Sequence, residues 1–164
     1  MAETDRTGFW EFACQLYRCQ EVEESCLWLQ DNADIDVVLL LCCCWAGREY
    51  DAIDRRMMAA LLDNCQRWSS AVIKPLRTAR RWLRNQPGTD ASLYEQLKNA
   101  ELAAERQLMQ RLEQQLQSQM ARSPIDPARV RDNAKKNTGL YLTLAEIDVH
   151  VDTERTLQRL FAAL

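Results

Sequence analysis

The sequence feature that most constrains the fold is a run of ten apolar residues over positions 37–46. It is far shorter than the roughly 20 residues a helix needs to cross a bilayer. Asp34 or Asp36 is placed to cap its start and Gly47 to end it, because side-chain oxygens favour N-caps and glycine often follows the last helical residue. A helix without a polar face must be covered on all sides. We therefore predict a central, buried helix over residues 35–46.

Apolar residues that recur every three or four positions predict further helices around this one. They lie over residues 7–19, 21–31, from about 51, 68–85, 90–120, from Pro127 and after Asp152. Pro75 either kinks its helix or occupies a first-turn position. The segment 86–89, Gln-Pro-Gly-Thr, is the clearest break. The fold predicted is all-α, a compact bundle of about six to eight helices in a single helical domain over residues 1–164.

One helix, near residues 91–118, is expected to be unusually long. It carries one apolar stripe that includes Leu93, Leu97 and Leu108 and a second formed by Leu102, Met109 and Leu116. Fewer than four clean heptads are present, so a bundle helix is favoured over a coiled coil. Two stripes would let the helix pack on its own domain and on another molecule at once.

The cysteines and the N-terminus favour a reducing, cytoplasmic setting. The N-terminal residues lack the basic start and apolar stretch of an export signal, and the seven cysteines are an odd number. Cys42, Cys43 and Cys44 are consecutive, so on a helix they point about 100° apart and do not converge on one metal ion. With a single histidine, His150, we expect no metal and no cofactor, and interpret the cysteines as small buried apolar residues.

Charge is segregated along the chain, although the overall formal charge is only −3. Residues 1–63 carry 13 acids and 5 bases, whereas residues 64–89 carry six bases and no acid. A helix over 67–84 would be basic, with Trp68 and Trp82 among its cations. Its candidate contacts to an anion or to an acidic partner are Lys74, Arg77, Arg80, Arg81 and Arg84.

Two interpretations of this basic helix stay open. It could hold nucleic acid, a phosphate ligand or an acidic protein surface. It could instead lie beside the acidic first half of the chain and form salt bridges within the molecule. The second is favoured, because the protein as a whole is acidic and lacks the basic excess typical of nucleic-acid binders.

Aromatic residues cluster at the start of the chain and in the apolar run. Phe9, Trp10 and Phe12, together with Trp45, could line a pocket between helices or anchor the core, which is the commoner role. No acid is paired with a base or a nucleophile, and no glycine-rich phosphate loop is present. We assign no catalytic residue and favour a protein that is not an enzyme.

Several short motifs mark the first half of the chain. They are Phe-Trp-x-Phe-Ala from Phe9, Cys-Leu-x-Leu-Gln-Asp from Cys26, Asp-Val-x-Leu-Leu-Leu from Asp36, and Trp45. Lys-Pro-Leu-Arg from Lys74 extends the pattern. With these motifs the chain resembles a family of uncharacterised helical proteins of gammaproteobacteria. The family has no established activity or cofactor, so the resemblance implies a bacterial cytoplasmic setting and no site residues.

The leading functional hypothesis is a non-catalytic protein-interaction or regulatory module of the bacterial cytoplasm. It would act through residues 91–118 and 67–84 on a protein partner or on a second copy of the chain. One alternative is a nucleic-acid or phosphate-ligand binder that uses the basic helix. The other is a small-molecule-binding protein or an enzyme with an interhelical pocket.

Overall fold

Helix α3 (Val37–Glu49) lies at the centre of the computed structural model, which describes residues 7–164. Every residue of α3 except Arg48 is buried, as its uniformly apolar sequence predicts. Asp36 caps it, with a carboxylate oxygen that accepts from the backbone N–H groups of Val38 and Leu39 at 3.0 and 3.2 Å. The helix continues past Gly47 to Glu49, so the prediction that Gly47 ends it is wrong.

Gly47 serves close packing instead. A Cβ atom at this position would lie 2.6 Å from the backbone nitrogen of Ala134 in helix α7 (Pro127–Leu144). The side chain of Asn137, also in α7, donates to the carbonyl of Cys43 at 3.2 Å and accepts from the N–H of Ile53 at 2.8 Å. The buried Asn137 amide therefore has hydrogen-bond partners for both its nitrogen and its oxygen.

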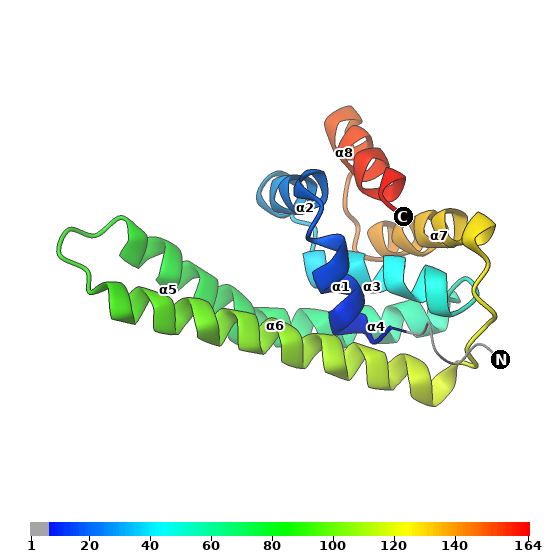
Figure 1. Ribbon diagram of the computed structural model, residues 1–164, viewed down its shortest axis with the longest axis horizontal. Helices are drawn as coiled ribbons and strands as arrows, with labels where there is room; N and C mark the ends of the chain where they lie inside the picture. The colour runs from blue at the N-terminus through cyan, green and yellow to red at the C-terminus, as the bar shows by residue number, and fades with distance from the viewer. Residues whose placement is uncertain (1–6) are drawn as a thin grey trace.

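Residues 7–164 form seven helices and no strand, which confirms the predicted all-α fold (Figure 1). Besides α3 and α7 these are α1 (Phe9–Leu16), α2 (Gln20–Asn32), α6 (Ala91–Gln119), α8 (Val151–Ala162) and one helix in three parts. The three parts are α4 (Arg55–Trp68), a π-helical turn η1 (Ser69–Ile73) and α5 (Lys74–Arg84). None of these helices combines the length and apolar composition needed to cross a membrane.

The joined helix corrects the prediction of a separate helix that starts at Trp68. Pro75 is the second residue after η1, at whose end the N–H of Lys74 reaches back five residues to the carbonyl of Ser69. In a regular α-helix the proline ring would press on the carbonyl four residues earlier. The wider π turn accommodates the proline, so the chain stays helical from Arg55 to Arg84.

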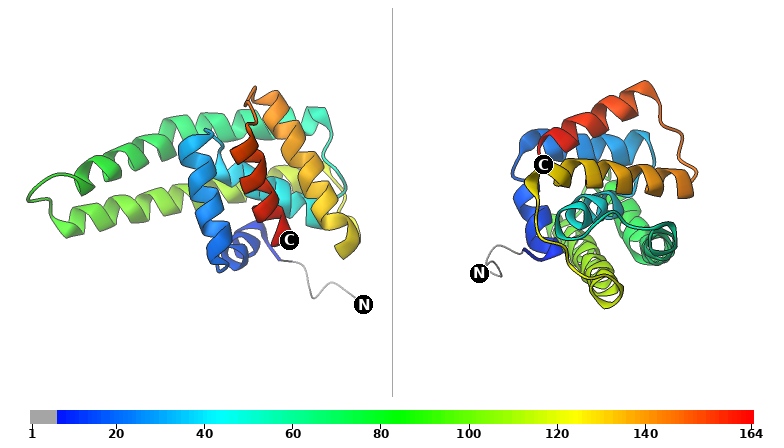
Figure 2. Two further views of the ribbon diagram at one scale, coloured as in Figure 1. Left: turned by 90° about the horizontal axis from the view of Figure 1, so that it is seen from above. Right: turned by 90° about the vertical axis from the view of Figure 1, so that its right-hand side faces the viewer.

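Helix α5 and the first part of α6 form an antiparallel hairpin that projects beyond the other helices (Figures 1 and 2). We call residues 74–100 the arm and the rest of the described chain the body. Helix α5 has no buried residue, and the buried residues of α6 all lie from Glu101 to Leu116. Asp90 caps α6 by accepting from the N–H of Ser92 at 2.9 Å. The 29 residues of α6 confirm the predicted long helix.

Candidate functional site

The predicted basic residues lie on α5, and the structure divides them into two groups. Arg77 and Arg80 face α6, where both bind the buried carboxylate of Glu101. Arg77 Nε lies 2.7 Å from Glu101 Oε1, and Arg80 Nε lies 2.5 Å from Oε2. Arg77 also reaches Glu105 at 2.8 Å. Since these arginine side chains are less than one fifth exposed, their charges join α5 to α6 and are turned away from solvent.

The pKa values of the two glutamates of this cluster are shifted in opposite directions. Burial by itself would raise the pKa of Glu101, but its hydrogen bonds and charge pairing with Arg80 and Arg77 outweigh burial and hold the pKa below the ordinary value. For Glu105, burial dominates and raises the pKa, and only Arg77 opposes it among its near neighbours. Glu101 is therefore the carboxylate that holds the cluster together.

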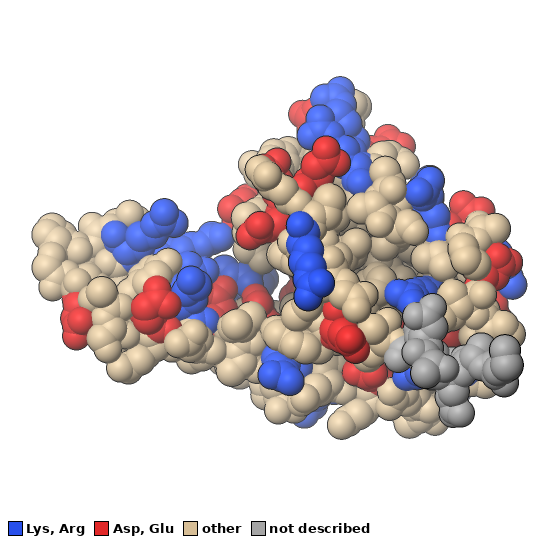
Figure 3. All heavy atoms as spheres, in the orientation of Figure 1, with Lys and Arg blue, Asp and Glu red and all other residues tan. Residues whose placement is uncertain are grey.

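Lys74 and Arg81 form the second group and turn towards α2 and the segment after it. Arg81 Nη2 lies 2.7 Å from the Oδ1 atom of Asp31, and Lys74 Nζ lies 3.9 Å from that of Asp34. All four side chains are about half exposed or more. Among residues 7–164, no ion pair is found for Arg84. In Figure 3, Lys and Arg side chains gather over the arm and face acidic side chains over α2 across a hollow.

Four of the five predicted cations are thus paired within the chain. Lys74 and Arg81 pair with the acidic first half, as the intramolecular interpretation expects. The partners of Arg77 and Arg80 lie on α6 and were not predicted. The sequence does contain a signal for these partners. Glu101 and Glu105 are four residues apart and share a helix face, and this matches the spacing of the cations on α5.

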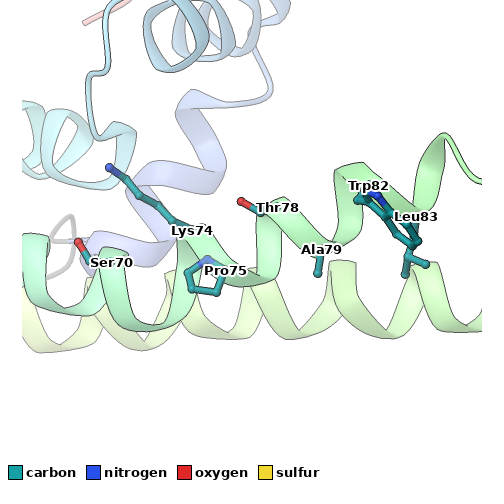
Figure 4. Close-up of a pocket in the computed structure, with 7 residues that line it drawn as sticks. All are labelled: Ser70, Lys74, Pro75, Thr78, Ala79, Trp82 and Leu83. Carbon is teal, nitrogen blue, oxygen red and sulfur yellow. The ribbon is translucent and has the colours of Figure 1, made fainter.

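An apolar row runs along the side of α5 opposite Arg77 and Arg80. Pro75, Ala79 and Trp82 line an open groove there together with the polar Thr78, as Figure 4 shows. The Trp82 ring is 62% exposed. On α6, Leu93 and Leu102 are 45% and 50% exposed. These two leucines belong to the two apolar stripes predicted for the long helix, whose remaining members are mostly covered by the body.

The aromatic residues of the first half occupy two environments. Phe9, Phe12 and Trp45 lie in the core, where Phe9 stacks on Trp45 at a centroid distance of 5.4 Å. Trp10 is partly exposed and lies under the guanidinium of Arg106, 5.1 Å from the ring centroid. Two surface hollows lie elsewhere, one along α5 and one between residues 30–34 and 145–153.

All seven cysteines are free, and five of them are buried. Burial raises the pKa of the Cys26 thiol to about 11 and raises the pKa values of Cys42, Cys43, Cys44 and Cys65 further. These thiols stay protonated at neutral pH, so they behave as small apolar residues. Within the described part of the chain, no three side chains of the metal-binding types gather closely enough to hold an ion.

Residues 8–112 match a family model described as a protein of unknown function, DUF2390. The matched region runs from the start of α1 into the second half of α6. This chain belongs to the DUF2390 family. The match confirms the resemblance to an uncharacterised family, and the DUF2390 region includes both helices of the arm. No curated protein and no solved structure matches the chain.

Proposed function

We propose that this protein is a non-catalytic interaction module whose arm binds another protein chain. The observation that carries the proposal is an arm that leaves the body while exposing apolar side chains on both of its helices. Single exposed apolar residues are common on protein surfaces. Here a tryptophan that is 62% exposed lies beside an open groove, on a helix without a buried residue.

The composition of the exposed set also favours a protein partner. Tryptophan is enriched among the residues that dominate binding energy in protein interfaces, because it buries a large area at a low entropic cost. Trp82 on α5 and Leu93 and Leu102 on α6 lie on the arm or at its base. A partner chain that lies along the arm would cover these side chains.

The alternative of phosphate or nucleic-acid binding is less well supported. Arg77 and Arg80 would have to leave Glu101, which would stay behind as a buried carboxylate without its partners. Of the five predicted cations on α5, Lys74, Arg81 and Arg84 are then the ones left for an anion to contact. No observation favours an enzyme or a small-molecule carrier over the interaction module.

A cytoplasmic setting is part of the proposal. Its support is the state of the cysteines: all seven are free, and five lie within the core without forming a disulfide. Free cysteines in this number are typical of reducing compartments.

The experiment is site-specific photo-cross-linking in native lysate treated with nuclease. A photoreactive amino acid replaces Trp82, Leu93 or Leu102, and Val151 on α8, which is 72% exposed, is the control position. We expect a discrete cross-linked protein from at least one arm position and none from Val151. If the arm positions gave no protein adduct, or only the products seen from Val151, the proposed function would be wrong.

A further inference from the structure

A notch separates the arm from α2, and its two walls carry opposite charge. Figure 1 shows α2 above the root of the arm, and Figure 3 shows the hollow between them, with acids over α2 and cations over the arm. The ion pair between Arg81 and Asp31 spans this notch at 2.7 Å. Both walls therefore belong to one continuous patch of surface.

The α2 wall is acidic with an apolar centre. Glu24, Leu27 and Asp31 follow one another at spacings of three and four, so they share a helix face. Asp31 binds Arg81, and this places the face towards the arm. Leu27 is 50% exposed and Glu24 is exposed. This wall thus presents carboxylates on both sides of an exposed leucine.

The α5 wall is basic and has its own apolar row. Lys74 and Arg81 lie on the side that faces α2, and Thr78 lies between them on the helix. Trp82 and Pro75 lie alongside in the open groove. Arg84 is a further exposed cation near the tip, but it lies seven residues after Arg77 and so shares the α6 side of the helix. The α5 wall is thus the electrostatic opposite of the α2 wall, and each has one large exposed apolar side chain, Leu27 or Trp82.

We propose that this notch is the contact of a symmetric dimer, in which the arm of each copy lies against α2 of the other. The inference rests on the proposed function, and it names a second copy of the chain as the partner. A two-fold axis places the same patch of the two copies face to face in opposite orientations. The acidic α2 of each copy then contacts the basic α5 of the other, so the interface contains this contact twice. Leu27 and Trp82 become covered in both copies.

The charge pattern favours a second copy over an unrelated acidic protein. An acidic partner would match α5 but would leave the acids of α2 facing like charge. The ion pairs of Arg81 and Lys74 with α2 and its following segment are solvent-exposed, and exposed pairs contribute little to a lone chain. Their members can therefore exchange to partners on a second copy at small cost, and covering the notch strengthens each pair because water is excluded.

The first measurement is the mass in solution by sedimentation equilibrium across a range of concentrations. We expect a reversible dimer of twice the 19.1 kDa chain mass, and its dissociation constant should rise with salt. Trp82→Ala should raise that constant by roughly 10-fold or more, because a central aromatic side chain is lost. Val151→Ala, on an exposed position of α8, should leave it unchanged.

The second measurement uses complementary charge reversal. One variant carries Glu23→Lys and Glu24→Lys on α2, and the other carries Lys74→Glu and Arg81→Glu on α5. Each variant alone opposes like charges across both contacts and should be monomeric. An equimolar mixture restores opposite charges at both contacts and should form a heterodimer. All four positions are exposed, so each variant should keep the helical circular dichroism of the parent chain.

Two outcomes overturn the dimer. The first would be a parent chain that stays monomeric at every concentration. The second would be a parent chain that dimerises while each charge-reversed variant dimerises equally well alone, because the contact would then lie elsewhere. A monomeric chain that still forms a cross-link from Trp82 to a different protein would reject the dimer and leave the proposed function standing. A monomer without cross-links would reject both.

Discussion

Gly47 lies at a point where the backbone of α7 approaches α3 closely. The Cβ of an alanine at this position would lie 2.6 Å from the Ala134 nitrogen, which is backbone and cannot rotate aside. We expect Gly47→Ala to lower the free energy of unfolding by about 1–3 kcal/mol, the usual cost of overpacking a core. Urea denaturation followed by circular dichroism measures the change.

Gly139 supplies the matched control for that substitution. It lies within α7, and a Cβ there would meet no atom within 4 Å. Because alanine is the better helix former, we expect Gly139→Ala to raise the free energy of unfolding by about 0.5–1 kcal/mol. Equal effects of the two substitutions would show that space between α3 and α7 is not what Gly47 provides.

At the scale of elements, Glu101 joins the two helices of the arm. Glu101→Gln keeps the shape of the side chain but removes the charge that binds Arg77 and Arg80. We expect the free energy of unfolding to fall by about 2 kcal/mol at pH 7, because the two arginines are left near a neutral amide. Hydrogen exchange of α5 amides should accelerate by roughly 30-fold at the same pH. Glu95→Gln, at an exposed position of the same helix, should change neither quantity measurably.

The effect of Glu101→Gln depends on pH in a defined direction. The pKa of Glu101 is lowered in the folded state, so its contribution is complete above the unfolded glutamate pKa of about 4.3 and is lost as the pH falls through the folded value. The difference between the parent chain and the variant should therefore shrink as the pH falls below about 4.3. A constant difference would mean that the carboxylate charge is not its cause.

Local sequence rules predicted the elements whose causes are local. The start of α6 follows from Asp90, and the start of α7 from Asp126 and Pro127. The continuity of α4 with α5 was missed, because a π turn that accommodates Pro75 leaves no mark in apolar periodicity. The role of Gly47 was missed because its reason, the backbone at Ala134, lies far along the chain.

The candidate site was predicted only in part, for a similar reason. Periodicity identified the cations of α5 and the apolar stripes of α6, but it could not show which of them the body covers. Exposure of Leu93 and Leu102, and burial of Leu108 and Leu116, depend on where α6 leaves the body. That point is set by packing between distant helices.

At the scale of the whole molecule, the cysteines report on the integrity of the core. Cys14 and Cys19 are exposed, whereas the other five are buried and protonated. We expect a thiol reagent such as dithiobis(nitrobenzoate) to modify two cysteines quickly in the native protein. The remaining five should react at least roughly 100-fold more slowly, because a reagent reaches each of them only when the core opens. In guanidinium chloride, all seven should react quickly. Fast reaction of more than two native thiols would contradict the packing described.

The central helix α3 packs most extensively on α7, a segment made late in synthesis. Residues 37–49 leave the ribosome well before α7, which ends at Leu144 and supplies the contacts at Gly47 and Cys43. At ordinary translation rates of about 5–20 residues per second, that interval lasts on the order of 5–20 seconds. Throughout it the nascent chain displays ten consecutive apolar residues that cannot yet be fully enclosed. We expect chaperones to bind this stretch until α7 has been made and covers it.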